Sequence, residues 1–189
     1  MKGRSFEIVR LMKQKRIDVI LVQETKWKGN RAAEIGAGCK LFYVGGDGRR
    51  NGVGIILTPD LKENVMEVVR KSDRIIGMKI EWYGEIWNIV SVYAPQVGCT
   101  LKEKEDFWRD LDEVIQGVPT AERLLVGGDF NGHVGASNGG FEEVHGGHGL
   151  GVRNDEGLSL LDFALSYEMK IVNTMFIKRE DHLVTYKSS

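Results

Sequence analysis

Short apolar runs, rich in β-branched residues, recur along the chain and end in glycine, proline or polar residues. Runs of about four to eight such residues are typical of buried strands. The tripeptide YGE at 83–85 predicts a hairpin turn between two of these runs. We therefore predict strands within residues 17–24, 40–44, 52–57, 65–70, 74–82, 86–95, 123–128, 170–174 and 183–186.

Three other segments have the spacing of amphipathic helices. Residues 5–16 form the first. Thr100 and Glu103 make a capping box that begins the second, which is expected to end at Gly117. Asn154 can cap the third. The predicted apolar faces consist of Phe6, Val9 and Met12, of Phe107, Leu111, Val114 and Ile115, and of Leu158, Leu161 and Leu165.

The order of these elements indicates the fold class. Strands come in runs, with helices between only some of them, which favours an α/β (α+β) fold of two packed sheets flanked by helices. A length of 189 residues suits one domain with a sizeable core, so we expect residues 1–189 to form a single domain. The glycine-rich segment 132–152 is predicted to be a long loop, functional or mobile.

Composition narrows the class of protein. Hydrophobic residues are 42%, charged residues are 28% and the formal net charge is -1, so there is no global basic signal for nucleic acid, although a local groove can still be basic. No apolar run is long enough to span a bilayer, and no secretory signal is visible. Cys39 and Cys99 make no disulfide framework. We expect an intracellular protein of the nucleus or cytoplasm, not secreted, with no membrane partner and no obligate protein partner evident.

The stretch LLVGGDFNGHVG at 124–135 places polar side chains directly after an apolar run. In an extended chain Asp129 and Asn131 point to the same face. Gly127 and Gly128 remove side-chain bulk just before them, so another group can approach the backbone closely. Two interpretations stay open for this stretch alone: a functional site, or an ordinary turn built from aspartate, asparagine and glycine.

Two further strands end in the same way, at Glu24 and at Tyr93. If these strand ends cluster, both residues would line one pocket with Asp129 and Asn131. Carboxylate oxygens suit Mg²⁺ or Mn²⁺, and the chain offers no Cys/His spacing typical of zinc. A divalent cation beside a carboxylate, an amide and a phenol can hydrolyse a phosphodiester. The sequence therefore predicts metal-dependent phosphodiester chemistry.

The motifs QETKW (23–27), VYAP (92–95) and GGDFN (127–131), in this order, resemble the endonuclease/exonuclease/phosphatase superfamily. The stretch 153–176 is similar to the endonuclease domains of LINE-type retroelements, RTE-type in particular, and to the craniofacial development protein 2-like proteins derived from them. The resemblance implies a four-layer α/β/β/α sandwich of two mixed sheets flanked by helices. It also implies a Mg²⁺-dependent DNA endonuclease-like hydrolase of retrotransposon origin.

The resemblance also implies a role for individual residues. Glu24 matches the metal-binding glutamate, and Tyr93 matches a tyrosine that contacts the scissile phosphate. Asp129 matches the aspartate that orients or deprotonates the attacking water or protonates the leaving group, and Asn131 matches the asparagine that holds the phosphate. Supporting positions are Gln23, Thr185 and His133, the last with a structural loop histidine as the alternative. Contacts to the nucleic acid are expected from Lys26, Trp27 and Lys28.

The chain departs from the family pattern at both ends. It begins after the family's first strand and stops before the strand that carries an Asp-His pair, so we expect an incomplete sandwich. Asp181-His182 precedes the 183–186 strand and is interpreted as a solvated loop. One hypothesis is an active endonuclease, and the alternative is a catalytically inactive domesticated binding or interaction module with the same fold. A phosphatase or phospholipase of the superfamily is a third hypothesis, which the 153–176 stretch argues against.

Overall fold

The computed structural model describes residues 5–48 and 50–178. The chain divides into two compact units, Met1–Asp129 and Phe130–Ser189. The expectation of a single domain stays a prediction. Within the described residues, no helix is both long enough and apolar enough to cross a membrane.

The first sheet of the Met1–Asp129 unit is antiparallel throughout, with the strand order β1-β4-β3-β2. Its strands are β1 (Val19–Val22), β2 (Gly29–Gly36), β3 (Cys39–Gly45) and β4 (Val53–Leu57). All five residues of β4 are buried, because β4 lies between β1 and β3 and both of its faces are covered.

The second sheet of this unit has the order β5-β6-β7-β8. Its strands are β5 (Val65–Ser72), β6 (Ile75–Trp82), β7 (Glu85–Tyr93) and β8 (Arg123–Asp129). The first three are antiparallel neighbours, and β7 and β8 are parallel. A parallel pair needs a crossover, which is provided by helix α3 (Leu101–Gln116). Helix α3 begins with the predicted capping box: the side chain of Thr100 accepts from the Glu103 backbone N–H, and Glu103 accepts from the Thr100 backbone.

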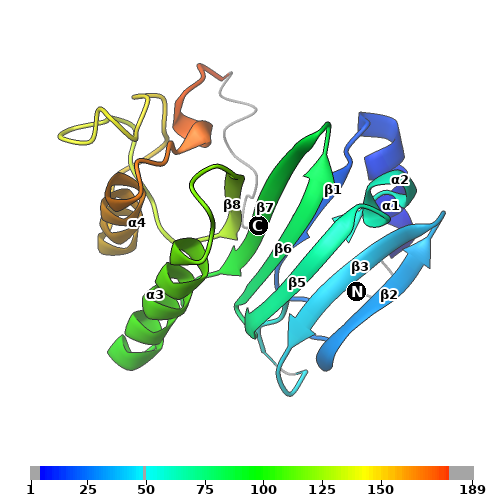
Figure 1. The fold of residues 1–189 in the computed structure, drawn as a ribbon. Helices are drawn as coiled ribbons and strands as arrows, with labels where there is room; N and C mark the ends of the chain where they lie inside the picture. The colour runs from blue at the N-terminus through cyan, green and yellow to red at the C-terminus, as the bar shows by residue number, and fades with distance from the viewer. Residues whose placement is uncertain (1–4, 49, 179–189) are drawn as a thin grey trace. The chain divides into compact units, whose positions relative to one another are not determined.

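The two sheets pack face to face, with one helix outside each (Figure 1). Successive side chains of β3 point to opposite faces of its sheet. Phe42 and Val44 belong to the core between the two sheets. Leu41 and Tyr43 pack on the other face, with residues of helix α1 (Ser5–Lys15). Helix α3 contacts β5 and β6 and buries Phe107, Leu111 and Ile115. The short helix α2 (Pro59–Lys62) follows β4. The predicted sandwich of two sheets flanked by helices is confirmed.

Two local predictions for this unit were incomplete. The spacing predicts Phe6 on the buried face of the first helix, but its side chain is 77% exposed, and of the three predicted apolar residues only Val9 and Met12 are buried. Strand β2 was not predicted at all. It is an edge strand of its sheet and most of its residues are exposed, so the sequence GNRAAEIG shows no alternation of apolar and polar residues.

The Phe130–Ser189 unit contains helix α4 (Asp155–Ser166) and the short 3₁₀ helix η1 (Val172–Thr174). Asn154 caps α4 as predicted, because its side chain accepts from the Gly157 backbone N–H. The strand predicted at 170–174 is wrong. The Thr174 hydroxyl donates to the Ile171 carbonyl at 2.7 Å and accepts from the Gly146 N–H, so local side-chain bonds favour a turn over an extended chain. Residues 183–186 lie outside the described residues.

The glycine-rich segment 132–152 is organised by two side chains. The Arg153 guanidinium donates to the carbonyl groups of four residues and lies over the Phe141 ring, 4.9 Å from its centroid. The four carbonyl groups belong to Val134, Ser137, Asn138 and Gly139. His145 is fully buried, with Nδ1 accepting from the Gly147 N–H at 3.0 Å and Nε2 lying 3.1 Å from the Gly135 carbonyl oxygen. The loop is thus held both by contacts within it and by hydrogen bonds to Arg153 and Thr174, which follow it in the chain.

Candidate active site

The glycines before Asp129 allow three strands to approach one another. A Cβ on Gly128 would lie 2.0 Å from the Val92 carbonyl oxygen, so β8 can run this close to β7 only without a side chain there. A Cβ on Gly127 would lie 2.7 Å from Cδ1 of Leu21 on β1. The sequence predicts that another group approaches the backbone closely at this glycine pair. In the structure these groups belong to the neighbouring strands β7 and β1.

This packing brings the ends of β7 and β8 side by side. Tyr93 and Asp129, the last residues of these strands, are register partners in the parallel pair. The chain stays paired one residue further, because the Ala94 N–H donates to the Asp129 carbonyl oxygen at 2.8 Å. Tyr93 is 5% exposed, whereas Asp129 is an exposed residue. A carboxylate that solvent can reach thus lies next to a buried phenol.

Glu24 reaches the same place from the other sheet, through the turn that follows β1. Its backbone is left-handed, with φ of 51°, a conformation that costs a residue other than glycine about 1–2 kcal/mol. Two backbone hydrogen bonds hold the turn in place: the Thr25 N–H donates to the Gly52 carbonyl, and the Lys26 N–H donates to the Asn51 carbonyl. Thr25 is buried, and its hydroxyl has no hydrogen-bond partner within the described part of the chain.

The Tyr93 phenol connects the two sheets. Its hydroxyl donates to Oε1 of Glu24 at 2.9 Å and accepts from Nε2 of Gln96 at 3.1 Å. Burial raises the pKa of the Tyr93 phenol above its ordinary value, as do the hydrogen bond to Glu24 and the charges of Glu24 and Asp129. The phenol therefore keeps its proton near neutral pH and stays a hydrogen-bond donor beside both carboxylates.

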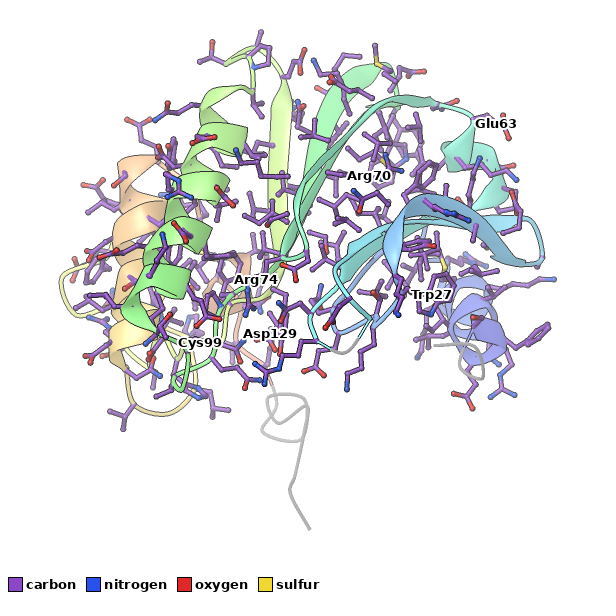
Figure 2. The ribbon with its side chains drawn as sticks, turned by 90° about the horizontal axis from the view of Figure 1, so that it is seen from below. Trp27, Glu63, Arg70, Arg74, Cys99 and Asp129 are labelled. Carbon is purple, nitrogen blue, oxygen red and sulfur yellow. The ribbon has the colours of Figure 1, made fainter. Side chains whose placement is uncertain are left out.

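The other residues expected near Glu24 differ in their surroundings. Nε2 of Gln23 donates to the Ser91 hydroxyl on β7 at 3.3 Å. The Lys26 ammonium lies 3.7 Å from Oε2 of Glu24, and both side chains are more than half exposed. Trp27 packs edge-on against Tyr43, with 4.9 Å between the ring centroids, so part of its indole belongs to the core (Figure 2). Lys28 is exposed.

The remaining predicted site residues do not belong to the Met1–Asp129 unit. Asn131 has a left-handed backbone, with φ of 50°. The His133 backbone N–H donates to Oδ1 of Asn154, and His133 is exposed. Thr185 and the Asp181-His182 pair lie outside the described residues.

A pocket of about 440 Å³ opens beside Glu24 and Tyr93. It is lined by Glu24, Lys26, Arg50, Asn51, Arg74, Tyr93, Gln96, Gly98, Cys99 and Glu103. Figure 2 shows Arg74, Cys99 and Asp129 gathered in one region, with Arg70 and Glu63 elsewhere. Arg74 and Gln96 were not selected from the sequence. Arg74 stands before the apolar run of β6, where an arginine is an ordinary surface residue, and only the pairing of β6 with β7 brings it to Tyr93.

The oxygen ligands near Tyr93 determine which kind of metal site could form there. No group of three or more His, Cys, Asp and Glu side chains that could hold a metal ion occurs among residues 5–48 and 50–178. Glu24 offers one carboxylate that is 51% exposed. Mg²⁺ is commonly bound through one or two carboxylates and keeps several waters and substrate phosphate oxygens as its other ligands. The site therefore fits a Mg²⁺ or Mn²⁺ ion of this kind, and it does not fit a cage made of protein side chains.

Comparison with known proteins gives a consistent result. The model of the Endonuclease/Exonuclease/phosphatase family matches residues 1–155. Craniofacial development protein 2 of Bos taurus is 28% identical over 179 residues, which cover 94% of this chain and 30% of that protein. The transposon TX1 uncharacterized 149 kDa protein of Xenopus laevis is 23% identical over 141 residues, which cover 68% of this chain and 10% of that protein. The chain thus spans less than a third of the length of either relative.

Among solved structures, the endonuclease domain of TRAS1, a telomere-specific non-LTR retrotransposon, has a similar fold. The TM-score is 0.55 at 16% sequence identity, and the match covers 86% of this chain and 64% of that chain. The likeness at this identity concerns the fold. These matches agree with the resemblance drawn from the three sequence motifs.

Proposed function

Because the chain belongs to the endonuclease/exonuclease/phosphatase family, we propose that it is a Mg²⁺- or Mn²⁺-dependent phosphodiester hydrolase that cuts DNA. The observation that carries the proposal is the Tyr93 phenol, which is hydrogen-bonded to Glu24 and is in register with Asp129. Two carboxylates and one protonated phenol at adjoining strand ends are groups that can orient water and stabilise a phosphorane.

Each side chain has a distinct part in this proposal. The Asp129 carboxylate orients the attacking water or takes its proton. The Tyr93 hydroxyl donates to a phosphate oxygen as negative charge develops there, which requires it to keep its proton. Its present acceptor is Oε1 of Glu24, so substrate binding has to redirect the hydroxyl or share it with the phosphate.

The remaining roles follow from the donor set and the family motif. Glu24 would hold the divalent cation, which supplies electrostatic stabilisation of phosphate oxygens when bound. The Asn131 amide would hold the phosphate. Gln23 steadies the Glu24 turn through its hydrogen bond to Ser91 on the neighbouring sheet. DNA is the proposed substrate because the GDFN block and the 153–176 stretch resemble retroelement endonuclease domains.

A nicking assay on supercoiled plasmid tests the proposal. The wild-type chain should convert supercoiled plasmid to open circles with Mg²⁺ present, and a chelator should stop the conversion. Asp129→Ala, Glu24→Gln and Tyr93→Phe should each lower the rate by at least about 10²-fold. Glu63→Gln is the matched control for Glu24→Gln, because Glu63 is an exposed glutamate away from the pocket and should leave the rate unchanged (Figure 2).

Each other outcome selects a different hypothesis. A wild-type rate no higher than that of Asp129→Ala would reject the hydrolase, and retained plasmid binding would then favour the inactive binding module. Faster turnover of a soluble phosphoester than of plasmid would favour the phosphatase hypothesis.

A further inference from the structure

The pocket beside Glu24 and Tyr93 is richer in positive charge than the chain as a whole. The full chain has a formal net charge of -1, yet three cationic side chains, those of Lys26, Arg50 and Arg74, line this one pocket. Its volume of about 440 Å³ falls in the range of roughly 300–1,000 Å³ typical of pockets for small ligands, and it exceeds what a single water or ion needs.

Arg74 is the best-positioned of the three cations. Its Nη1 donates to the Tyr93 carbonyl oxygen at 3.2 Å, and its guanidinium lies over the Tyr93 ring, 5.5 Å from the centroid. Its Nη2 lies 3.9 Å from Sγ of Cys99. Backbone pairing fixes the same two residues, because the Tyr93 N–H donates to the Arg74 carbonyl at 2.9 Å. The guanidinium is therefore held rigidly beside the candidate catalytic phenol, with further N–H groups available to a ligand.

Both carboxylates of the pocket accept hydrogen bonds from neutral donors, and Oε2 of Glu24 also lies 3.7 Å from the Lys26 ammonium. Glu24 accepts from the Tyr93 hydroxyl, and Glu103 accepts from both the backbone N–H and the hydroxyl of Thr100 at 2.8 Å. The Thr100 hydrogen bonds lower the pKa of Glu103, and the charges of Arg74 and Arg50 lower it further. Both arginines are thus close enough to act on the Glu103 carboxylate, which already accepts from Thr100, and their guanidinium N–H groups can bind a strong anion.

We propose that Arg74, with Arg50 and Lys26, forms a subsite for the phosphate group that neighbours the scissile one. This inference rests on the proposed function and makes it more specific. A substrate with adjacent phosphates fills both the subsite and the position beside Asp129, whereas a substrate with one phosphate leaves the subsite empty. The chain therefore prefers polynucleotides to isolated phosphodiesters.

Cys99 provides a direct probe of this subsite, independent of hydrolysis. It lines the pocket beside Arg74 and is partly exposed, so a thiol reagent can reach it. Cys39, the other cysteine, is buried, and burial raises the pKa of its thiol, so it should react much more slowly. Peptide mapping of the alkylated full chain then reports the reaction rate at Cys99 alone.

The probe is a short oligothymidylate, added without divalent metal so that it is not cleaved. It should slow alkylation of Cys99 at concentrations where sodium chloride of equal ionic strength does not. An oligothymidylate with uncharged methylphosphonate linkages should give no protection, because it has the same bases and sugars without the charges that the arginines bind.

Three variants separate the subsite from a structural role of Arg74. Arg74→Gln should weaken the protective effect of oligothymidylate by about tenfold, and Arg50→Gln, at an exposed position that leaves folding intact, should weaken it by severalfold. Arg70→Gln is the matched control, because Arg70 is a partly buried arginine of the same unit that does not line the pocket (Figure 2). Protection is compared with and without ligand in each variant, so a changed basal reactivity of Cys99 does not affect the comparison.

The results distinguish this inference from the proposed function. Protection that depends on Arg74 and Arg50 supports the subsite, even if plasmid is never nicked. The subsite is overturned if oligothymidylate gives no protection of Cys99, or no more than chloride gives. It is also overturned if protection is unchanged in both Arg74→Gln and Arg50→Gln. Either result holds even if plasmid nicking succeeds. If Arg74→Gln does not fold, Arg50→Gln decides the question alone.

Discussion

At the scale of single residues, the turn that carries Glu24 has an unusual backbone. Glu24 and Lys26 both have positive φ angles, 51° and 54°, and Asn51 in the facing segment has 55°. Such conformations cost free energy at residues other than glycine, and they persist where surrounding hydrogen bonds fix them. Here the bonds to Asn51 and Gly52 do so. The backbone of the turn therefore sets the direction of the Glu24 side chain. This direction brings its carboxylate to the Tyr93 hydroxyl.

Titration of Tyr93 tests this contact. Burial and Glu24 raise its pKa, so the favourable contribution to stability is present below the ordinary pKa of tyrosine and is lost as pH rises through the folded-state value. The difference in phenolate absorbance between the wild-type chain and Tyr93→Phe should give a curve displaced to higher pH than that of free tyrosine. Glu24→Gln should move the Tyr93 curve to lower pH, since it removes a negative charge. An unchanged curve in Glu24→Gln would contradict the hydrogen bond.

Substitution of Gly128 tests the close approach of β8 to β7. Gly128→Ala places a methyl group where the Val92 carbonyl oxygen lies, so it should cost at least about 3 kcal/mol of the free energy of unfolding. Gly84→Ala is the matched control: Gly84 also has a positive φ, of 78°, but its Cβ would meet open space, so the cost should be limited to about 1–2 kcal/mol of backbone strain. Urea unfolding measures both. Equal costs would show that the close approach is not rigid.

The sequence could indicate some of these residues and not others. Glu24, Tyr93 and Asp129 each end an apolar run within a recognisable motif, so the sequence alone could select them. Arg74 and Gln96 contact Tyr93 through strand pairing and a turn, which no local pattern encodes. The roles predicted for Glu24, Tyr93 and Asp129 stay predictions until the variants are assayed.

At the scale of elements, the β6–β7 hairpin shows how local sequence determines register. Trp82 pairs with Glu85, so Tyr83 and Gly84 form a two-residue loop. Both have positive φ, 53° and 78°, as a type I′ turn requires. The turn predicted from YGE is confirmed. Its first position is held by a tyrosine that is 88% exposed, although asparagine adopts this conformation with much less strain.

Replacement of this tyrosine should stabilise the hairpin. Tyr83→Asn should raise the free energy of unfolding by about 0.5 kcal/mol, because relief of backbone strain exceeds the loss of the exposed stacking on Trp82. Tyr83→Ala loses the same stacking and keeps the strain, so it should be destabilising. Urea unfolding of the three chains gives the comparison, and an asparagine variant no more stable than the alanine variant would refute the strain argument.

Prediction of the elements succeeded where burial shaped the sequence. The strands of the two cores show continuous or alternating apolar residues, and helix α3 has its capping box. Strand β2 was missed because its exposed edge position needs no apolar pattern. The β-branched residues of 170–174 predict a strand, but the hydrogen bonds of Thr174 favour a turn, and Val172–Thr174 form a 3₁₀ helix. The errors thus occur where polar contacts, and not burial, determine the conformation.

At the scale of the whole molecule, the fold class followed from the order of strands and helices, and it is confirmed by the two sheets with their outer helices. The pairing of β7 with β8 was not predictable in the same way. It depends on the α3 crossover, and a parallel partner leaves no local signal such as a tight turn.

The unfolding transition tests the expected single domain. The buried apolar cluster within the described part of the Phe130–Ser189 unit consists of Val144, Leu161 and Ala164, a core too small to support independent folding. We therefore expect one cooperative transition, with equal calorimetric and van't Hoff enthalpies. Two separate heat-absorption peaks would mean that the units fold independently.

The parallel pairing of β7 with β8 also bears on the order of events in folding. The β6–β7 hairpin closes through a two-residue turn and can form within microseconds, whereas β8 can join only after the chain has traversed all of α3. Tyr93 and Asp129 come together at that late step. A nascent or refolding chain therefore brings these two side chains of the candidate site together only once β8 has joined the sheet.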